Sequence, residues 1–202
     1  MHAHKRLFLR KATCQIDTCN KTIGQTDFLG ETNHAMREYP SFSRMVNPSI
    51  MLDLNLSEYA WALKIKTHQE IAEVWDPVRR RWVKMFPEEF VRQLTLAFLI
   101  TQKGYPAGRI AVEKTLQCHH LTKRCDILVY AADGSPFLLV ECKAPQIPLG
   151  TEVFLQAANY NLALQVPYLM MTNGPYSYGC SMDYRHRKVA EISEIPEYPA
   201  DA

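Results

Sequence analysis

Residues 124–145, RCDILVYAADGSPFLLVECKAP, contain two short apolar runs joined by Asp133 and Gly134. Runs of this length, rich in branched and aromatic residues and bounded by turn residues, are typical of buried strands. An Asp-Gly pair between two such runs signals a tight hairpin, because glycine readily takes the positive φ that the turn requires. The stretch therefore predicts two adjacent antiparallel strands at 124–130 and 136–142.

Two acids and a lysine meet at one end of this predicted hairpin. Glu141 and Lys143 are two residues apart on a strand, so their side chains project from the same face. Asp126 lies at the start of the preceding strand, and the hairpin turn brings that start beside the end of the next strand. Glu and Lys are disfavoured in a strand interior, and such departures from local preference cluster at functional sites.

The arrangement suits metal-assisted chemistry on a phosphate. Asp126 and Glu141 can hold Mg²⁺ or Mn²⁺ through hard oxygen ligands while positions remain for water and phosphate. The ion would lower the pKa of a bound water and neutralise phosphoryl charge, and Lys143 could orient that water or stabilise the developing charge. The alternative is a set of cross-strand salt bridges on a solvated face, because an ExK triplet by itself is common.

The other predicted elements alternate between helix and strand. Residues 87–103 form a helix in this interpretation, with Pro87 at the first helical position and Gly104 at its end. Further strands are predicted at 109–117 and 167–172, a second helix at 152–165, and a closing hairpin at 176–184 and 187–192. The order helix, three strands, helix, strand predicts an α/β (α+β) fold with a mixed sheet flanked by helices.

The 202 residues suit one domain with an appendage. We expect residues 1–44 to be a poorly ordered N-terminal extension, because they show no sustained helical or strand period. The domain is predicted to span 45–202, with a β meander at 58–84, a catalytic core at 87–172 and the closing hairpin within 176–192. One hypothesis for the extension is that translation of the native protein starts at Met45 or Met51.

Charge and cysteine content place limits on the class of protein. A net charge of +2 is small for a protein that coats DNA without sequence preference. The six cysteines form no CxxC pair, and we expect reduced thiols and a cytoplasmic location. No apolar run is long enough to span a membrane. A thiol enzyme built on Cys142 is disfavoured, because alternation turns that side chain away from Glu141 and Lys143, into the core.

These motifs resemble the PD-(D/E)xK nuclease superfamily. More narrowly, they are similar to the N-terminal domain of type I restriction enzyme R proteins, in a stand-alone bacterial form. Besides the triplet, the resemblance covers roughly 50–195 and rests on PEEFVRQ (87–93), GYP (104–106), AVEK (111–114), QAANY (156–160) and PYLMMTNG (167–174). It implies a restriction-endonuclease-like αβββαβ core. It also implies a DNA endonuclease of restriction-modification that hydrolyses phosphodiester bonds with Mg²⁺ or Mn²⁺.

The resemblance assigns roles within the triplet. Asp126 and Glu141 are the implied metal ligands, and Lys143 is the implied catalytic lysine. The backbone carbonyl of Cys142 is implied to complete the metal shell. Cys125 stands where the family pattern often has proline, a residue that many superfamily members also lack.

Residues on the two predicted helices have implied roles as well. An acid on the first helix often joins the site, and we choose Glu88 over Glu89 because the spacing ExxxR recurs in the family. Either acid could instead simply favour the helix N-terminus. Gln156 and Tyr160 match a QxxxY element, share one helix face, and are implied to contact the DNA backbone or to order the site. The alternative for this pair is packing at the edge of the surface.

A basic stretch lies before the first helix. Arg79, Arg81 and Lys84, with Trp82 between them, are candidate phosphate contacts. Their alternative is a solvated strand edge that charge protects from pairing.

Partners follow from what the sequence lacks. No GxxxxGK[ST] phosphate loop is present, so we expect ATP-driven translocation to belong to a separate helicase, motor or specificity subunit. DNA is the expected substrate, and a homodimer would allow both strands to be cut. The competing hypothesis is a DNA-binding or assembly module of a restriction or repair complex that keeps the fold and does not cleave.

Overall fold

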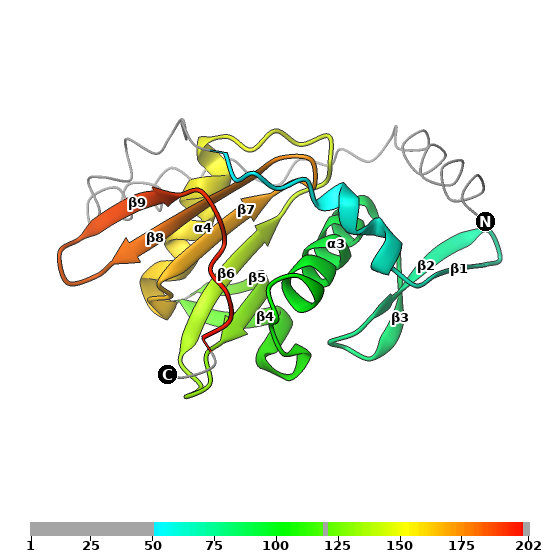
Figure 1. Cartoon of the computed structure of the whole chain (residues 1–202), viewed down its shortest axis with the longest axis horizontal. Coiled ribbons are helices and arrows are strands. Elements are labelled where there is room, and N and C mark those ends of the chain that lie inside the picture. Colours follow the sequence, from blue (N-terminus) through cyan, green and yellow to red (C-terminus); the bar gives the residue numbers. More distant parts are fainter. Residues whose placement is uncertain (1–50, 119–120, 200–202) are drawn as a thin grey trace.

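The computed structural model describes residues 51–118 and 121–199. The predicted extension at 1–44 therefore lies outside the described residues. The main sheet has the strand order β4-β5-β6-β7-β8-β9 (Figure 1). Its strands are β4 (Ile110–Cys118), β5 (Leu121–Tyr130), β6 (Pro136–Cys142), β7 (Tyr168–Thr172), β8 (Ser177–Asp183) and β9 (Lys188–Ile192).

The sheet is mixed because one connection contains a helix. Strands β6 and β7 run parallel, joined by α4 (Thr151–Leu164), whereas every other neighbouring pair in this sheet is antiparallel. A parallel pair needs such a crossover, while hairpins suffice for the antiparallel pairs. Gly134 has a φ of +88° in the β5–β6 turn. The observed architecture confirms the predicted mixed sheet flanked by helices.

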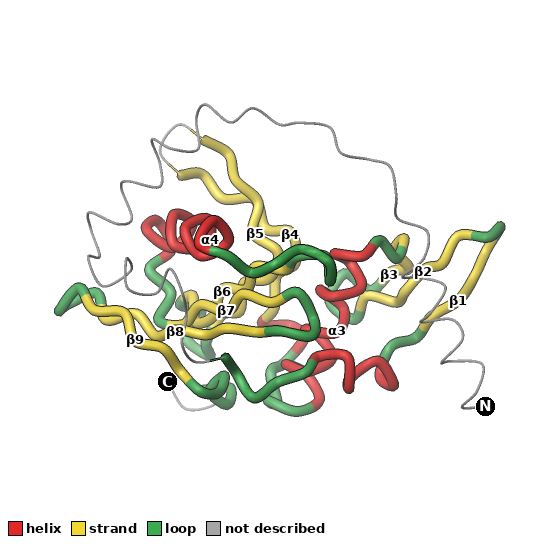
Figure 2. The backbone as a smooth tube through the Cα atoms, turned by 90° about the horizontal axis from the view of Figure 1, so that it is seen from above, coloured by secondary structure: helices red, strands yellow, loops and turns green. Residues whose placement is uncertain are grey.

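Helices cover both faces of the sheet (Figure 2). Phe154 and Ala157 of α4 pack on one face against Leu139 and Met171. Helix α3 (Pro87–Thr101) packs on the opposite face, where Leu94 and Phe98 join Val140 and Cys142. Successive side chains of β6 therefore point alternately toward α4 and toward α3. None of the described helices is long and apolar enough to cross a membrane.

A small three-stranded sheet precedes α3. Strands β1 (Ile65–His68), β2 (Ile71–Asp76) and β3 (Arg81–Lys84) pair in sequence order, as the predicted meander requires. The prediction was wrong at its start, because residues 58–62 belong to a 3-10 helix, η2 (Leu56–Ala62). Asn55 caps this helix by accepting from the Ser57 N–H, and Leu56 is completely buried. Capping and burial of this side chain outweigh the local alternation of polar and apolar residues.

Candidate active site

The hairpin of β5 and β6 brings the two predicted acids together. Ile127 pairs with Val140, so continuing the register by one residue places Asp126 beside Glu141. The backbone N–H of Cys142 donates to Asp126 Oδ2 at 2.7 Å. Asp126 is 8% exposed and Glu141 is 4% exposed. Two carboxylates are therefore held side by side in a largely dry environment at the end of β6.

Lys143 completes this group on the α4 side of the sheet. Its Nζ donates to Glu141 Oε1 at 2.7 Å and to Gln156 Oε1 at 3.0 Å. Burial by itself would lower the pKa of Lys143, but the charge of Glu141 and its hydrogen bond raise it overall. The structure thus joins Gln156, from the predicted QxxxY element, to the triplet through the lysine. The side chain of Tyr160 lies outside what the structure describes.

Burial and the like charge of its neighbour both affect the ionisation of Glu141. Burial, followed by the nearby charge of Asp126, raises the pKa of Glu141 to about 7, while Lys143 opposes the shift. Two buried carboxylates a short distance apart resist ionising together unless a cation is near. A glutamate whose pKa is close to neutrality is also common among functional groups.

Arg92 is a site residue to which the sequence analysis assigned no role. It projects from α3, is 3% exposed, and its Nη2 donates to Asp126 Oδ1 at 2.6 Å. Its Nη1 donates to Glu89 Oε2 at 2.5 Å, and its Nη2 also reaches Glu88 Oε1 at 3.2 Å. The available signal was the i, i+4 spacing of Glu88 and Arg92 on one helix face.

The structure separates the two candidate acids of the first helix. Burial and the charge of Asp126 raise the pKa of Glu88, and Arg92 and Lys143 lower it, so this half-exposed carboxylate faces the triplet. Glu89 is buried and turns toward Gln93 and Arg92 instead. The two neighbouring acids therefore differ in burial, since Glu88 is half-exposed and Glu89 is buried.

Glu89 belongs to a second buried network. Arg79 donates to Asp76, Glu89 and Glu113, and Gln93 Nε2 donates to Asp76 Oδ2 at 2.9 Å. Asp76 is completely buried and also accepts from the backbone N–H groups of Val78 and Arg79. The network therefore links the β2–β3 hairpin to the helix that carries Arg92.

Glu113 stands opposite Asp126 in the β4–β5 register, between the pairs Val112–Ile127 and Lys114–Cys125. Its φ of +53° is uncommon for a residue with a side chain, and such conformations occur often at functional sites. Its carboxylate accepts from Arg79 at 2.8 Å and lies 3.4 Å from Arg124. The AVEK motif contains this residue.

The predicted basic cluster does not form one surface. The guanidinium of Arg79 forms ion pairs with three carboxylates, so it is not available to contact a DNA phosphate. Arg81 pairs with Asp76 across the ladder, and Lys84 pairs with Glu73. Because Arg81 and Lys84 are three residues apart on β3, their side chains point to opposite faces of the small sheet. Both are exposed.

The donor set fits a hard divalent cation. Arg92 and the Cys142 N–H each use one oxygen of Asp126, and a carboxylate offers about four lone-pair positions in all. In the described part of the chain, no three or more His, Cys, Asp and Glu side chains are grouped to hold a metal ion. A cation here would therefore take further ligands from a backbone carbonyl, water or phosphate, as Mg²⁺ commonly does.

The thiol of Cys142 is completely buried on the α3 side, with Thr95 Oγ1 at 3.8 Å. Burial raises its pKa well above the ordinary thiol range, and Asp126 adds to the shift. A thiol with a raised pKa is a poor nucleophile. The structure thus agrees with the expectation that this cysteine packs in the core.

Comparison with known proteins identifies the same region. Residues 87–196 match the family described as the type I restriction enzyme R protein N terminus. A solved fragment of an HsdR subunit of a type I restriction enzyme from Vibrio vulnificus YJ016 is 21% identical, with a TM-score of 0.42. That match covers 55% of this chain and 24% of the solved one, so this chain spans about a quarter of its relative. A search of curated proteins finds no match.

Proposed function

The chain belongs to the family of type I restriction enzyme R protein N termini, and from this premise we propose that it is a Mg²⁺-dependent DNA endonuclease or nuclease subunit. The observation that carries the proposal is the buried pair of Asp126 and Glu141, with Lys143 Nζ 2.7 Å from Glu141. Family membership supports a nuclease role, and the chemistry of these three side chains supports phosphodiester hydrolysis.

Asp126 and Glu141 would hold the ion, with Glu88 and the Cys142 carbonyl as further oxygen ligands. Bound there, Mg²⁺ or Mn²⁺ would supply a water of lowered pKa and neutralise charge on the phosphate. The Cys142 N–H and Arg92 hold Asp126 in one orientation. A ligand fixed in this way loses little conformational entropy when the ion binds.

Lys143 would act on the reacting phosphate or on the attacking water. Its ammonium group remains charged at neutral pH, since its pKa lies above the ordinary value for lysine. Gln156 accepts from Nζ and so aims the lysine along the α4 side of the sheet. Arg81 and Lys84 are proposed DNA contacts, because an exposed cation on the meander can pair with phosphate. Tyr160 is a further proposed contact, through the QxxxY element that it shares with Gln156.

The test is cleavage of supercoiled plasmid with Mg²⁺ or Mn²⁺. Wild-type protein is expected to nick the plasmid, whereas Lys143→Ala and an EDTA control leave it intact. Lys188→Ala is the matched control, because Lys188 is an exposed strand lysine on β9, outside the proposed site. Equal nicking by wild type and Lys143→Ala would reject this lysine as the catalytic group.

One observation favours a second function, a DNA-binding or assembly module that does not cleave. The buried guanidinium of Arg92 already neutralises Asp126, so the charge of this carboxylate is compensated without a metal ion. Calorimetric titration with Mn²⁺ separates the two proposals. Uptake that is lost in Asp126→Asn and Glu141→Gln supports the nuclease, and no uptake by wild type supports the binding module.

The partners are also part of the proposal. A separate motor or specificity subunit would supply translocation along DNA, since type I restriction enzymes are the setting of this family. We place the protein in the bacterial cytoplasm, where such a subunit and DNA are accessible. A homodimer would provide two sites for cutting both strands.

A further inference from the structure

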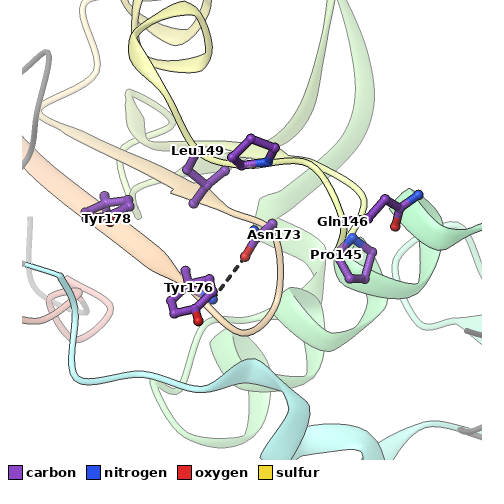
Figure 3. A pocket seen from close by; sticks show the side chains of 7 residues that line it. Pro145, Gln146, Leu149, Asn173, Tyr176 and Tyr178 are labelled. Carbon is purple, nitrogen blue, oxygen red and sulfur yellow. Dashed lines mark hydrogen bonds between the residues drawn. The ribbon is translucent and has the colours of Figure 1, made fainter.

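A cavity of about 390 Å³ opens beside the loop that follows Lys143 in the chain (Figure 3). Its lining comes from the loop that leads from β6 to α4, from the turn that joins β7 to β8, and from Tyr178 near the start of β8. The lining residues are Pro145, Gln146, Pro148, Leu149, Asn173, Tyr176 and Tyr178, all of them uncharged. The side chain of Tyr176, at the mouth of the cavity, is 55% exposed.

The cavity lies on the same side of the sheet as Lys143. Glu141 pairs with Met171, and Met171 pairs with Tyr178, so these three residues form one row across β6, β7 and β8. Directly paired residues share a face, so Tyr178 projects on the α4 side as Glu141 does. Two strand spacings separate their backbones, a distance of roughly 10 Å. The backbone N–H of Lys143 donates to Thr172 O at 2.8 Å, where the two loops diverge.

The two loops are tied to each other, so the cavity is formed in advance of any ligand. Asn173 Nδ2 donates to Ile147 O at 2.9 Å, and Asn173 Oδ1 accepts from the Tyr176 N–H at 3.0 Å. Pro145 and Pro148 restrict the backbone of the first loop. The ring of Tyr178 packs against Phe154 of α4, with ring centroids 5.8 Å apart. A rigid aromatic surface costs little entropy to bind against.

We propose that this cavity binds an unpaired nucleobase of the DNA strand, next to the phosphate that is cut. The inference rests on the proposed function, which places a phosphate at Asp126 and Glu141. A strand that crosses those carboxylates passes the cavity with a neighbouring nucleotide. Tyr176 would stack on the face of the base.

Only an unpaired base can enter such a cavity. In duplex DNA the faces of each base are covered by its neighbours in the stack, and turning one base out of the stack costs free energy. Single-stranded or distorted DNA does not incur this cost. The cavity therefore favours single strands, strand ends or unpaired junctions over regular duplex.

The test measures binding of fluorescein-labelled DNA by anisotropy, with Ca²⁺ in place of Mg²⁺ to prevent cleavage. A single strand and the duplex of the same sequence are compared for wild type, Tyr176→Ala and Tyr176→Phe. Stacking on one aromatic ring predicts that Tyr176→Ala binds the single strand about 10- to 100-fold more weakly. Tyr176→Phe keeps the ring and should bind as wild type does, and duplex affinity should be unchanged in both variants.

Trp61→Ala is the matched control, because Trp61 is 68% exposed on η2 and does not line the cavity. In a second readout, 2-aminopurine is moved along the strand one position at a time. One position should be quenched by wild type and by Tyr176→Phe but not by Tyr176→Ala.

The outcomes separate this inference from the proposed function. If Tyr176→Ala binds the single strand as tightly as wild type, or weakens duplex binding equally, the base site is rejected even if the protein cuts DNA. If Tyr176-dependent binding is present but wild type does not nick plasmid, the base site stands and the nuclease is rejected. A wild-type protein that binds neither form of DNA overturns both.

Discussion

The guanidinium of Arg92 and the carboxylate of Asp126 form a buried ion pair, with Nη2 and Oδ1 2.6 Å apart. It ties α3 to β5, the first strand of the hairpin, although the two residues are 34 positions apart in the sequence. Removing one partner of a buried pair is costly, because the other charge is left without compensation. The pair therefore makes the stability of the fold and the geometry of the proposed site depend on the same residue.

Replacement of Arg92 by methionine should destabilise the protein by about 3–5 kcal/mol, since Asp126 would lose its buried cation and Glu89 would lose one of two. Thermal unfolding followed by circular dichroism should show a midpoint lower by roughly 10 °C. Added Mn²⁺ should raise the midpoint of the variant more than that of wild type, because the ion can supply the missing positive charge. If Arg92→Met does not fold, Arg92→Lys keeps a charge and tests the same relation. An equal effect of Mn²⁺ on variant and wild type would contradict it.

The raised pKa of Glu141, about 7, predicts that stability falls as the pH rises. The folded state binds this proton more tightly than the unfolded chain, so deprotonation above the ordinary glutamate pKa disfavours folding until the pH passes about 7. Metal affinity should change in the opposite direction and rise over the same range, since only the ionised carboxylate is a ligand. Melting and Mn²⁺ titrations from about pH 5 to about pH 8 measure both.

Glu141→Gln should make the melting temperature less dependent on pH in that interval. Glu152→Gln, which changes an exposed glutamate at the start of α4, is the control and should leave the dependence intact. If the wild-type melting temperature rises steadily with pH through this range, the burial of Glu141 does not control the pH dependence of stability.

The neighbouring acids Glu88 and Glu89 should respond differently to neutralisation. Glu89→Gln is expected to cost about 3 kcal/mol or more, because Arg79 and Arg92 both pair with this buried carboxylate. Glu88→Gln should cost less than about 1 kcal/mol, since its side chain is 49% exposed. If Glu88 joins the metal site, its variant should nevertheless bind Mn²⁺ more weakly. Urea unfolding measures the stability of the two variants, and calorimetry measures their affinity for Mn²⁺. A Glu88→Gln variant less stable than Glu89→Gln would contradict the assignment of Glu89 as the structural acid.

Gly179 should tolerate no larger residue without a rearrangement. A Cβ at this position would lie 2.8 Å from Ile192 Cγ1 and 3.2 Å from Leu52 Cδ2, in a packed region. Gly179→Ala is therefore expected to destabilise the protein by about 1–3 kcal/mol through overpacking. Gly108→Ala is the control, because a Cβ there would meet nothing within 4 Å. Equal unfolding midpoints for the two variants would mean that β8, β9 and residue 52 shift apart at little cost.

Local signals predicted the hairpin well, because its turn and its strands are determined by neighbouring residues. The Asp133-Gly134 turn and the apolar runs beside it place Asp126 opposite Glu141, as the register of β5 and β6 shows. The helices over 87–103 and 152–165 were recognised for similar reasons, although they end earlier, at Thr101 and Leu164. Residues 58–62 were assigned wrongly, because burial of Leu56 against α3 determines their conformation.

The sequence by itself determined the order of elements, the position of the two acids and the lysine on one hairpin, and the resemblance that family membership confirmed. Only the tertiary structure decided which charges meet. Arg92 reaches Asp126, and Arg79 turns inward to Glu89 and Glu113, because α3 and the β2–β3 hairpin pack against the end of the sheet. A charge pattern along the chain cannot distinguish an exposed arginine from a buried one, since the desolvation cost and the partners that offset it come from distant segments.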